Sequence, residues 1–417
     1  MPFHDPPPLP RHILRHHRHP VSSLHISRDN ERIYSADSSG LVAVTSTRTI
    51  RPIAKWQAHK DSVLGIQEWG DSIITHARDN KIHVWTRITE SPPSASIGAS
   101  AALPDLPVPD SRESTDVNAL NFCRFSLLDL GVNLNATLAG VRDPQTANPQ
   151  VRRALIAVPN LVQSELADIW AVPGFERLHA AIGTPEFTSE RGTKESTGIS
   201  MALHLFTSDS LASTSSDPTP TLNLLSAYEN GSVQLRRYTP PRNNERRRGP
   251  YRTIEGRGWQ VTWSYKAHNE TVMGMSISLP NTLALTVSAD HLIGRYDLAP
   301  TDQPTPSGSV HRTKHPGNSA ITIHDDGKLC AVGSWDGRVR LFSTRSLKAL
   351  GTLSYHKESC QAVAFAHPLP PDPEADVGEE EEEFGLSVEE KSSRSRWLVA
   401  GGKDGRVSVW ELKEFAR

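Results

Sequence analysis

Acidic residues beside glycines are the part of this sequence with the clearest potential for chemistry. The stretch CAVGSWDGRVRLF (330–342) places Asp336 before Gly337, and VAGGKDGRVSVW (399–410) repeats this order around Asp404. A carboxylate there could act as a general acid or base, whereas Asp-Gly between two alternating apolar runs predicts a hairpin turn. A catalytic motif is needed once, but a structural motif can recur. Because the motif recurs, we interpret Asp336 as a turn residue.

Other patterns for catalysis or metal binding are weak in this chain. It contains no G-x-S-x-G, P-loop or H-E-x-x-H motif. The cysteines form no C-x-x-C pair, and the N-terminal histidines lack cysteines or carboxylates at ligand spacing; these residues are Cys123, Cys330, Cys360, His12, His16, His17 and His19. We therefore predict no cofactor, no metal and no enzymatic activity, with an enzyme that uses a central channel as the alternative.

Composition excludes several further classes. The 417 residues carry a formal net charge of −2, so no global field draws the chain to nucleic acid or to anionic membranes. No apolar run approaches the roughly 18 residues that a membrane-spanning helix needs. The N-terminal sequence lacks the apolar core of a secretory signal. We expect a soluble intracellular protein without membrane or direct nucleic-acid partners.

The turn motif recurs along the whole chain. Comparable turns are centred on seven positions, namely Ser39, Asp79, Ser164, Asn230, Asp290, Asp336 and Asp404. Ser39 and Asp79 are 79 − 39 = 40 positions apart, and Asp290 and Asp336 are 336 − 290 = 46 apart. These spacings are close to the roughly 40–45-residue period of four-stranded propeller blades.

A histidine precedes many of the repeats, as in AHKDSVLGIQEW (58–69) and AHNETVMGMSIS (267–278). Each unit then reads as a histidine, two strands, a turn, and a strand that ends in an aromatic residue. This order resembles the WD-repeat family and predicts an all-β, seven-bladed WD-repeat β-propeller with long disordered loop insertions. The predicted blades lie near 18–57, 58–89, 117–183, 198–240, 258–299, 314–352 and 355–412, and the inserts at 89–115, 207–221, 240–257 and 368–396.

The resemblance to WD repeats implies a buried hydrogen-bonded network in each blade. Its members are a histidine, the turn Asp, a strand Ser or Thr (Thr286 or Ser288 in the fifth repeat) and the aromatic residue. The matching residues are His59, Thr75, Asp79, Trp85, His268, Asp290, Tyr296, His315, Asp336, His356, Asp404 and Trp410. Phe342 in the sixth repeat cannot donate the hydrogen bond that Trp supplies.

The last repeat ends at Trp410, so it lacks a fourth strand of its own. The weakly alternating segment 10–17 precedes the first repeat, and we expect it to form the outer strand of the last blade. That pairing would cover an edge that is otherwise open to aggregation.

Two charged runs lie in the inserts. Arg246–Arg248 could be a nuclear address or a contact for an acidic partner or nucleic acid, and Glu379–Glu383 could engage basic partners. For both runs the alternative is a solvated loop without a binding role.

Partner contacts are predicted in two places. In PGFERLHAAI, the i, i+3, i+7 spacing of Phe175, Leu178 and Ile182 suits one face of a short helix, and the C-terminal tail carries Leu412 and Phe415. An apolar group in a polar rim often marks an interaction site. The alternative is that these side chains belong to the protein's own core.

Several longer stretches point to one branch of the WD-repeat family. PPPLPRHILRHH, WQAHKDSVLGIQEW, ADIWAVPGFERLHAAIG and LVAGGKDGRVSVWELKEF resemble fungal ASTRA-associated subunits, relatives of the G-protein-β-subunit-like proteins. The resemblance implies a nuclear scaffold, with cytoplasm as a second compartment, that takes part in chromatin remodelling. The implied partners are the ASTRA subunits and the co-chaperone trio of the phosphatidylinositol-kinase-related kinases. The alternative is a WD-repeat adaptor of another assembly, such as a ubiquitin-ligase substrate receptor or an RNA-processing subunit.

Overall fold

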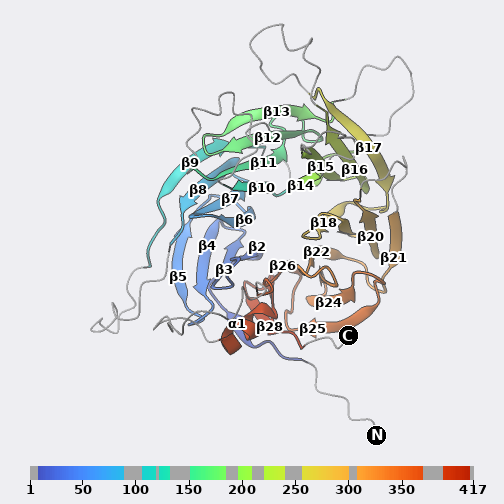
Figure 1. Ribbon diagram of the computed structural model, residues 1–417. Coiled ribbons are helices and arrows are strands. Elements are labelled where there is room, and N and C mark those ends of the chain that lie inside the picture. Colours follow the sequence, from blue (N-terminus) through green and yellow to red (C-terminus); the bar gives the residue numbers. More distant parts are fainter. Residues whose placement is uncertain are drawn as a thin grey trace, which may run out of the picture. The chain divides into compact units, whose positions relative to one another are not determined.

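The computed structural model describes residues 8–88, 106–118, 122–131, 151–184, 196–208, 220–239, 256–299, 308–369 and 388–413. The strands form seven separate four-stranded sheets, and each sheet is one blade of a β-propeller (Figure 1). The predicted all-β, seven-bladed fold is therefore confirmed.

In six blades the four strands follow one another in the chain and are neighbours in the sheet. The first three of these blades contain β2 (Val21–Ile26), β3 (Arg32–Asp37), β4 (Leu41–Ser46) and β5 (Pro52–Gln57); β6 (Val63–Trp69), β7 (Ser72–Ala77), β8 (Lys81–Thr86) and β9 (Ser111–Asp116); and β10 (Ser126–Gly131), β11 (Arg153–Pro159), β12 (Ala167–Val172) and β13 (Glu176–Ile182).

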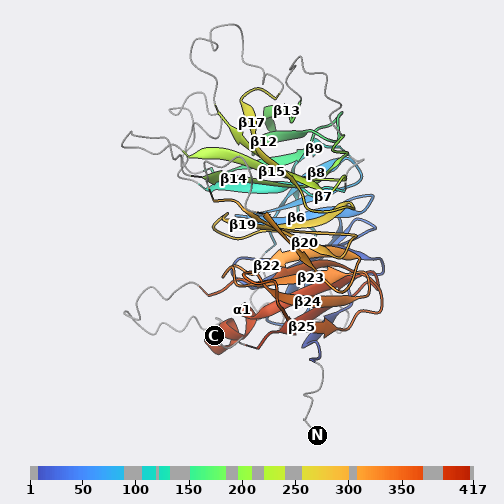
Figure 2. The same cartoon turned by 90° about the vertical axis from the view of Figure 1, so that its right-hand side faces the viewer.

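The next three blades have the same order. They contain β14 (Ser200–Ser208), β15 (Thr221–Tyr228), β16 (Ser232–Tyr238) and β17 (Trp259–Lys266); β18 (Val272–Ile277), β19 (Leu283–Ser288), β20 (Leu292–Asp297) and β21 (Gly308–Arg312); and β22 (Asn318–Ile323), β23 (Leu329–Ser334), β24 (Arg338–Ser343) and β25 (Ala349–Ser354). Figure 2 shows β23, β24 and β25 as successive strands of one sheet.

The seventh blade combines both ends of the chain. Its order is β1 (His12–Leu14), β28 (Val407–Glu411), β27 (Trp397–Gly402) and β26 (Cys360–Phe365). β1, from the segment 10–17, pairs antiparallel with β28 and places Ile13 opposite Ser408. The amide of Arg11 also donates to the carbonyl of Val409 at 2.7 Å.

Burial follows the position of a strand within its blade. Every residue of β3, β7, β23 and β27 is buried, since these strands are covered on both faces. β23 and β27 accordingly consist of apolar and small residues alone. In the outermost strand β25, Leu353 is buried and the other five residues are exposed. The sequence of a strand therefore indicates whether it lies inside a blade or at its margin.

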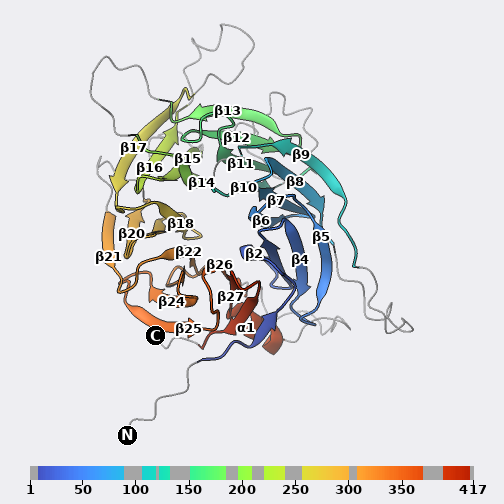
Figure 3. The same cartoon turned by 180° about the vertical axis from the view of Figure 1, so that it is seen from behind.

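The chain divides into two compact units. The first comprises Met1–Thr75, Val84–Arg112 and Thr322–Arg417. In it, β2 packs against β6 on one side and against β26 and β27 on the other (Figure 3). Leu14, Val21 and Val409 belong to one apolar core cluster of this unit, so β1 is held by burial as well as by pairing.

The second unit comprises His76–His83 and Glu113–Ile321. In it, β14 packs against β10 and β11 on one side and against β18 on the other. One apolar cluster gathers Leu155, Ile169, Ile182 and Leu205, and another gathers Leu235, Trp263 and Tyr296.

Three predicted boundaries need correction. The insert predicted at 89–115 contains the start of β9, the outer strand of the second blade. The insert predicted at 368–396 ends in a helix, α1 (Val388–Ser395), with acidic residues in its first turn and Arg394 in its last, the order that the helix dipole favours. The insert predicted at 207–221 begins within β14 and ends within β15.

The described residues contain no helix long and apolar enough to cross a membrane. The Arg246–Arg248 and Glu379–Glu383 runs, and nearly all of the insert predicted at 240–257, lie outside the described residues.

Candidate functional site

The second blade contains a hydroxyl-centred network. The Nε2 atom of His59 lies 2.8 Å from Oγ1 of Thr75, and Nε1 of Trp85 donates to the same oxygen at 2.8 Å. All three side chains are buried, on the segment before β6, on β7 and on β8 respectively. Asp79 lies half-buried in the turn between β7 and β8. The hydroxyl of Thr75 thus ties two strands of the blade to the histidine that precedes it.

The fifth blade contains all four expected members. Nδ1 of His268 lies 3.2 Å from both carboxylate oxygens of Asp290, and its Nε2 lies 2.8 Å from Oγ1 of Thr286. The hydroxyl of Tyr296 completes the chain at 3.1 Å from Thr286. Burial lowers the pKa of His268, although the charge of Asp290 opposes this. The imidazole is therefore a neutral structural group.

The seventh blade places the hydroxyl on a different strand. His356 bonds through Nδ1 to Asp404 at 3.0 Å and through Nε2 to Oγ of Ser408 at 2.9 Å. Nε1 of Trp410 donates to the same hydroxyl at 2.9 Å. Ala400 stands ten residues before Trp410, where Thr75 stands before Trp85, and it pairs directly with Ser408 across the sheet. In this blade the hydroxyl therefore comes from the third strand, from the residue that faces the usual position on the second strand.

The first blade contains a network that the sequence reasoning missed. His17 bonds through Nδ1 to Asp37 and through Nε2 to Ser35, both at 2.8 Å, with side chains of His17 and Asp37 that are 1% and 0% exposed. The sequence pattern of this repeat instead predicts His19, at the start of HPVSSLHIS (19–27), as its histidine and Ser39 as its turn residue. The sequence does contain a signal for this network, namely the spacing between the histidine and the Asp. His17 and Asp37 are 37 − 17 = 20 positions apart, as are His59 and Asp79 (79 − 59 = 20).

The glycines of the turns approach these histidines. Gly337 has φ +76°, and a Cβ there would overlap the carbonyl of His356. Gly405 has φ +71°, and a Cβ there would lie 2.9 Å from the carbonyl oxygen of His17. The glycine of each Asp-Gly turn therefore lies against the backbone of a network histidine outside its own hairpin. This close approach leaves no room for a side chain at the glycine position.

The buried network predicted for His315 and Asp336 is wrong. Both residues are exposed. Asp336 instead accepts hydrogen bonds from Nη2 of Arg340 at 2.6 Å and from the amide of Arg338 at 3.2 Å. Val332 occupies the position four before the turn, where Thr75 stands relative to Asp79, and the residue facing it is Arg340, so neither strand supplies the central hydroxyl.

These contacts settle the chemical state of Asp336. Partial burial raises its pKa, but the hydrogen bonds and charge of Arg340 and the amide of Arg338 outweigh burial and hold the pKa below its usual range. Arg340 is itself buried and also donates to Oγ of Ser334 at 2.9 Å. An ionised, paired carboxylate at a turn fixes the hairpin and is poorly suited to act as a general acid at neutral pH.

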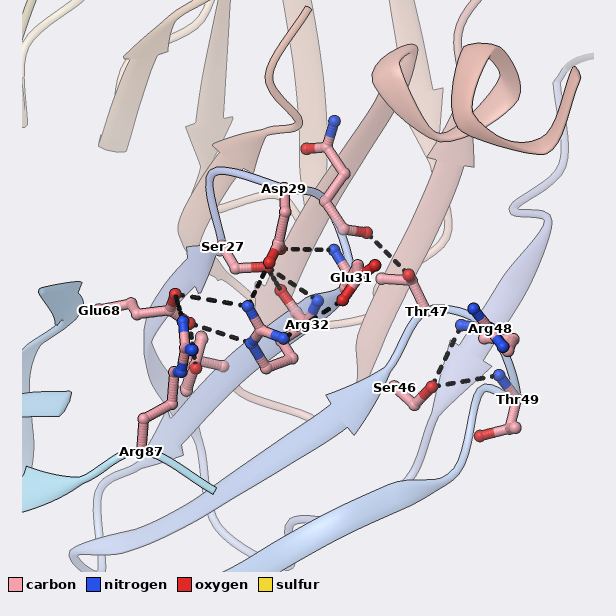
Figure 4. Close-up of polar contacts among 12 residues, drawn as sticks. Ser27, Asp29, Glu31, Arg32, Ser46, Thr47, Arg48, Thr49, Glu68 and Arg87 are labelled. Atoms are coloured by element: carbon pink, nitrogen blue, oxygen red, sulfur yellow. Dashed lines mark hydrogen bonds and ion pairs between the residues drawn. The ribbon is translucent and has the colours of Figure 1, made fainter. Parts of the chain in front are cut away.

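A second kind of polar cluster joins two blades of the first unit (Figure 4). Arg32 at the start of β3 bonds through Nε to Oε2 of Glu68 on β6 at 3.1 Å and also pairs with Asp29. Arg87, just after β8, reaches the other oxygen of Glu68 at 3.2 Å. Burial acts to lower the pKa of Arg32, but the hydrogen bond and charge of Glu68 outweigh it and raise the pKa. The pairing holds the two blades in register, since a buried charge is tolerated only when it is paired.

Thiol and metal chemistry find no support in the described part of the chain. Burial raises the pKa of Cys123, Cys330 and Cys360 to about 12, so these free thiols stay protonated and unreactive. Across the described ranges, no group of three or more His, Cys, Asp or Glu side chains is arranged to hold a metal ion.

The short helix predicted around Phe175, Leu178 and Ile182 is wrong. Leu178 and Ile182 lie on β13, which pairs antiparallel with β12 and places Ile182 opposite Ala167. Ile182 is 1% exposed in the core of the second unit, and Leu178 packs against the same cluster. Phe175 is half-buried in the preceding turn. Strand pairing turns alternate residues inward, which the helical pattern does not anticipate.

Of the two tail residues, Leu412 packs against the core cluster that contains Leu398 and Trp410. Phe415 lies outside the described residues. Leu178, Ile182 and Leu412 thus contribute to the protein's own cores, and their role as partner contacts stays a prediction.

Comparisons with known proteins agree with this geometry. The family model "WD domain, G-beta repeat" matches residues 309–343 and 386–411. ASTRA-associated protein 1 of Verticillium alfalfae is 31% identical over 427 residues, covering 97% of this chain and 93% of the relative. Proteins of the same name from Pyricularia oryzae and Schizosaccharomyces pombe are 29% and 25% identical, each over 97% of this chain and 97% and 99% of their own lengths. The chain therefore belongs to the ASTRA-associated protein 1 family of WD-repeat proteins.

Proposed function

We propose that this protein is a non-catalytic scaffold subunit of the nuclear ASTRA complex. The observation that carries the proposal is the likeness over nearly the whole chain to relatives named ASTRA-associated protein 1. The fold supports it, because the histidine networks of the first, second, fifth and seventh blades bond to the protein's own strands and turns and hold hairpins in place. A propeller whose polar groups serve its own structure can offer its outer surface to other proteins, as a subunit of an assembly must.

The finer parts of the proposal follow from the same family relationship. The protein would act in chromatin remodelling and would meet the co-chaperones that mature the phosphatidylinositol-kinase-related kinases. Its expected compartment is the nucleus, with cytoplasm as the second.

The test is affinity purification of the tagged full chain, expressed at its native level in its own host, followed by mass spectrometry. The matched control is a tagged WD-repeat protein of another assembly, handled in parallel. We expect ASTRA subunits and the kinase co-chaperones to be enriched with this chain and not with the control. Enrichment of a ubiquitin-ligase core or of RNA-processing subunits instead would contradict the proposal. Imaging of the same tagged chain tests the nuclear location.

A further inference from the structure

One tryptophan differs from all the others in this chain. Of the nine Trp residues, seven are buried and Trp170 is half-buried, whereas Trp335 is 51% exposed. Its position is nevertheless firmly held. Ser334 beside it is buried and bonded to Arg340, and Gly337 packs against the carbonyl of His356. A large apolar ring is thus presented to solvent on a rigid turn, and Trp is among the residue types that most often anchor protein interfaces.

This turn is the first of four segments of the first unit that contact one another in series. Gly337 lies against the carbonyls of His356 and Glu358, which places the turn beside 356–359. The amide of Lys403 donates to the carbonyl of Ser359 at 2.8 Å, and Gly405 lies against the carbonyls of His17 and His19. Segments 335–338, 356–359, 403–406 and 15–19 therefore follow one another as a continuous surface, which we call the basic face.

The basic face has a charge opposite to that of the whole chain. Its segments WDGR, HKES, KDGR and RHHRH carry six Lys or Arg and three Asp or Glu, so 6 − 3 = +3, whereas the chain as a whole carries −2. Arg18, Arg338, Lys357 and Lys403 are exposed there. Asp336 is paired with Arg340 and Asp404 with His356, which leaves Glu358 as the remaining acidic residue of the four segments.

We propose that the basic face binds an acidic segment of a partner protein, with Trp335 as the apolar anchor. The exposed cations match carboxylates that flank an apolar or aromatic side chain, and the indole supplies the area that such a side chain covers. Exposed charges of this kind set selectivity and the rate of encounter, while the buried aromatic contact supplies most of the affinity. The inference rests on the proposed scaffold function and specifies its surface and partner chemistry.

Nucleic acid is the competing occupant, and the arrangement favours it less. The exposed carboxylate of Glu358 lies among the cations of the face, next to Lys357, where it would repel a continuous row of phosphates. A protein segment of mixed apolar and acidic residues can place its carboxylates beside the cations alone.

The test uses a fluorescein-labelled peptide in which Glu alternates with Leu and Phe, and a control peptide with Gln in place of every Glu. Fluorescence anisotropy with the full chain measures the affinity. We expect Trp335→Ala and Lys357→Glu each to weaken binding of the Glu peptide by about tenfold, whereas Trp335→Phe keeps most of it. The effect of Lys357→Glu should shrink at high salt, because exposed charges are screened.

Matched controls lie in the same blade as Trp335. Leu350 on β25 is 41% exposed, and Lys348 is an exposed cation in the turn between β24 and β25, the opposite end of β24 from Trp335. We expect Leu350→Ala and Lys348→Glu to leave the affinity within about twofold of wild type, since a surface residue outside a binding site contributes little. Thermal unfolding confirms that each variant is folded.

Three results would overturn the inference: equal losses in the Trp335→Ala and Leu350→Ala variants, equal affinity for the Glu and Gln peptides, or tighter binding of a single-stranded oligonucleotide than of the Glu peptide. The outcome is separate from that of the proposed function. Recovery of ASTRA subunits without peptide binding would refute the basic face alone, and peptide binding without those subunits would refute the assembly alone.

Discussion

At the scale of single residues, the networks of the second, fifth and seventh blades share one hydroxyl within reach of both a histidine and an aromatic side chain. Thr75 and Thr286 supply it from the second strand of their blades, and Ser408 supplies it from the third. What the network needs is therefore a hydroxyl at one position in space, and either of two facing residues of a strand pair can supply it.

Replacing Thr75 by Val should lower the free energy of unfolding by about 1–3 kcal/mol, because it removes the acceptor of Trp85 and the partner of His59 inside a buried site. The control is Thr45→Val. Thr45 is equally buried, but its hydroxyl has no hydrogen-bond partner among the described residues, so Val there should be neutral or stabilising. Chemical denaturation measures both, and equal losses would show that the network contributes nothing specific.

The seventh blade offers a rescue experiment. Ser408→Ala should destabilise the protein by about the same 1–3 kcal/mol, since His356 and Trp410 both bond to that hydroxyl. Adding Ala400→Ser restores a hydroxyl at the position that Thr75 has in the second blade, directly opposite residue 408. We expect the double variant to regain part of the loss in a double-mutant cycle. Simple additivity of the two changes would refute this geometry.

At the scale of elements, the last blade depends on a strand from the other end of the chain. β1 contributes Leu14 to the core that also contains Val407 and Val409. Glu411 at the end of β28 bonds to Arg11, to Oγ of Ser393 on α1 at 2.9 Å and to Arg396 at 2.8 Å. One carboxylate thus ties β1, α1 and β28 together.

We expect Leu14→Ala to cost about 2–4 kcal/mol, because it empties part of a closed core and weakens the hold on β1. Leu9, five residues earlier, is 81% exposed, and Leu9→Ala should change stability by no more than about 0.5 kcal/mol. Denaturant unfolding of both variants tests this, and a Leu14→Ala variant as stable as wild type would mean that β1 does not contribute to the blade.

At the scale of the whole molecule, buried histidines make stability depend on pH. Burial lowers the pKa of His16, His25 and His179 to about 4, and it also lowers the pKa of His268. An unfolded histidine titrates near 6.5, so between about 6.5 and 4 the unfolded chain binds more protons than the folded one. The stability that these histidines contribute is complete above about pH 6.5 and is lost as pH falls toward 4.

Urea unfolding at several pH values from 7.5 to 4.5 should therefore show a falling free energy of unfolding, starting below about pH 6.5. His179 is a useful single probe, because Nε1 of Trp259 donates to its Nδ1 at 3.3 Å and a proton there would displace that bond. The slope should be shallower in His179→Gln. A flat profile between pH 7 and 5 would contradict the neutral, buried state of these rings.

The sequence by itself determined the repeat and the fold class of this protein. Polar turn residues between alternating runs favour hairpins, and the recurrence of seven such turns, several of them near the blade period, leaves few architectures open. Local physics suffices there, because turn geometry and strand periodicity are properties of neighbouring residues.

Tertiary structure alone decided which residues meet. His17 rather than His19 joins the first network, because in the folded blade its ring reaches Ser35 and Asp37 on β3. The pattern around Phe175 and Ile182 reads as a helix, yet pairing with β12 makes it a strand, because hydrogen bonds across the sheet outweigh a weak local preference. Asp336 resembles the other turn carboxylates, but it bonds to Arg340, which faces Val332 where the seventh blade has Ser408 facing Ala400, so neither strand supplies the hydroxyl. Such contacts depend on packing between segments that the chain brings together only after folding.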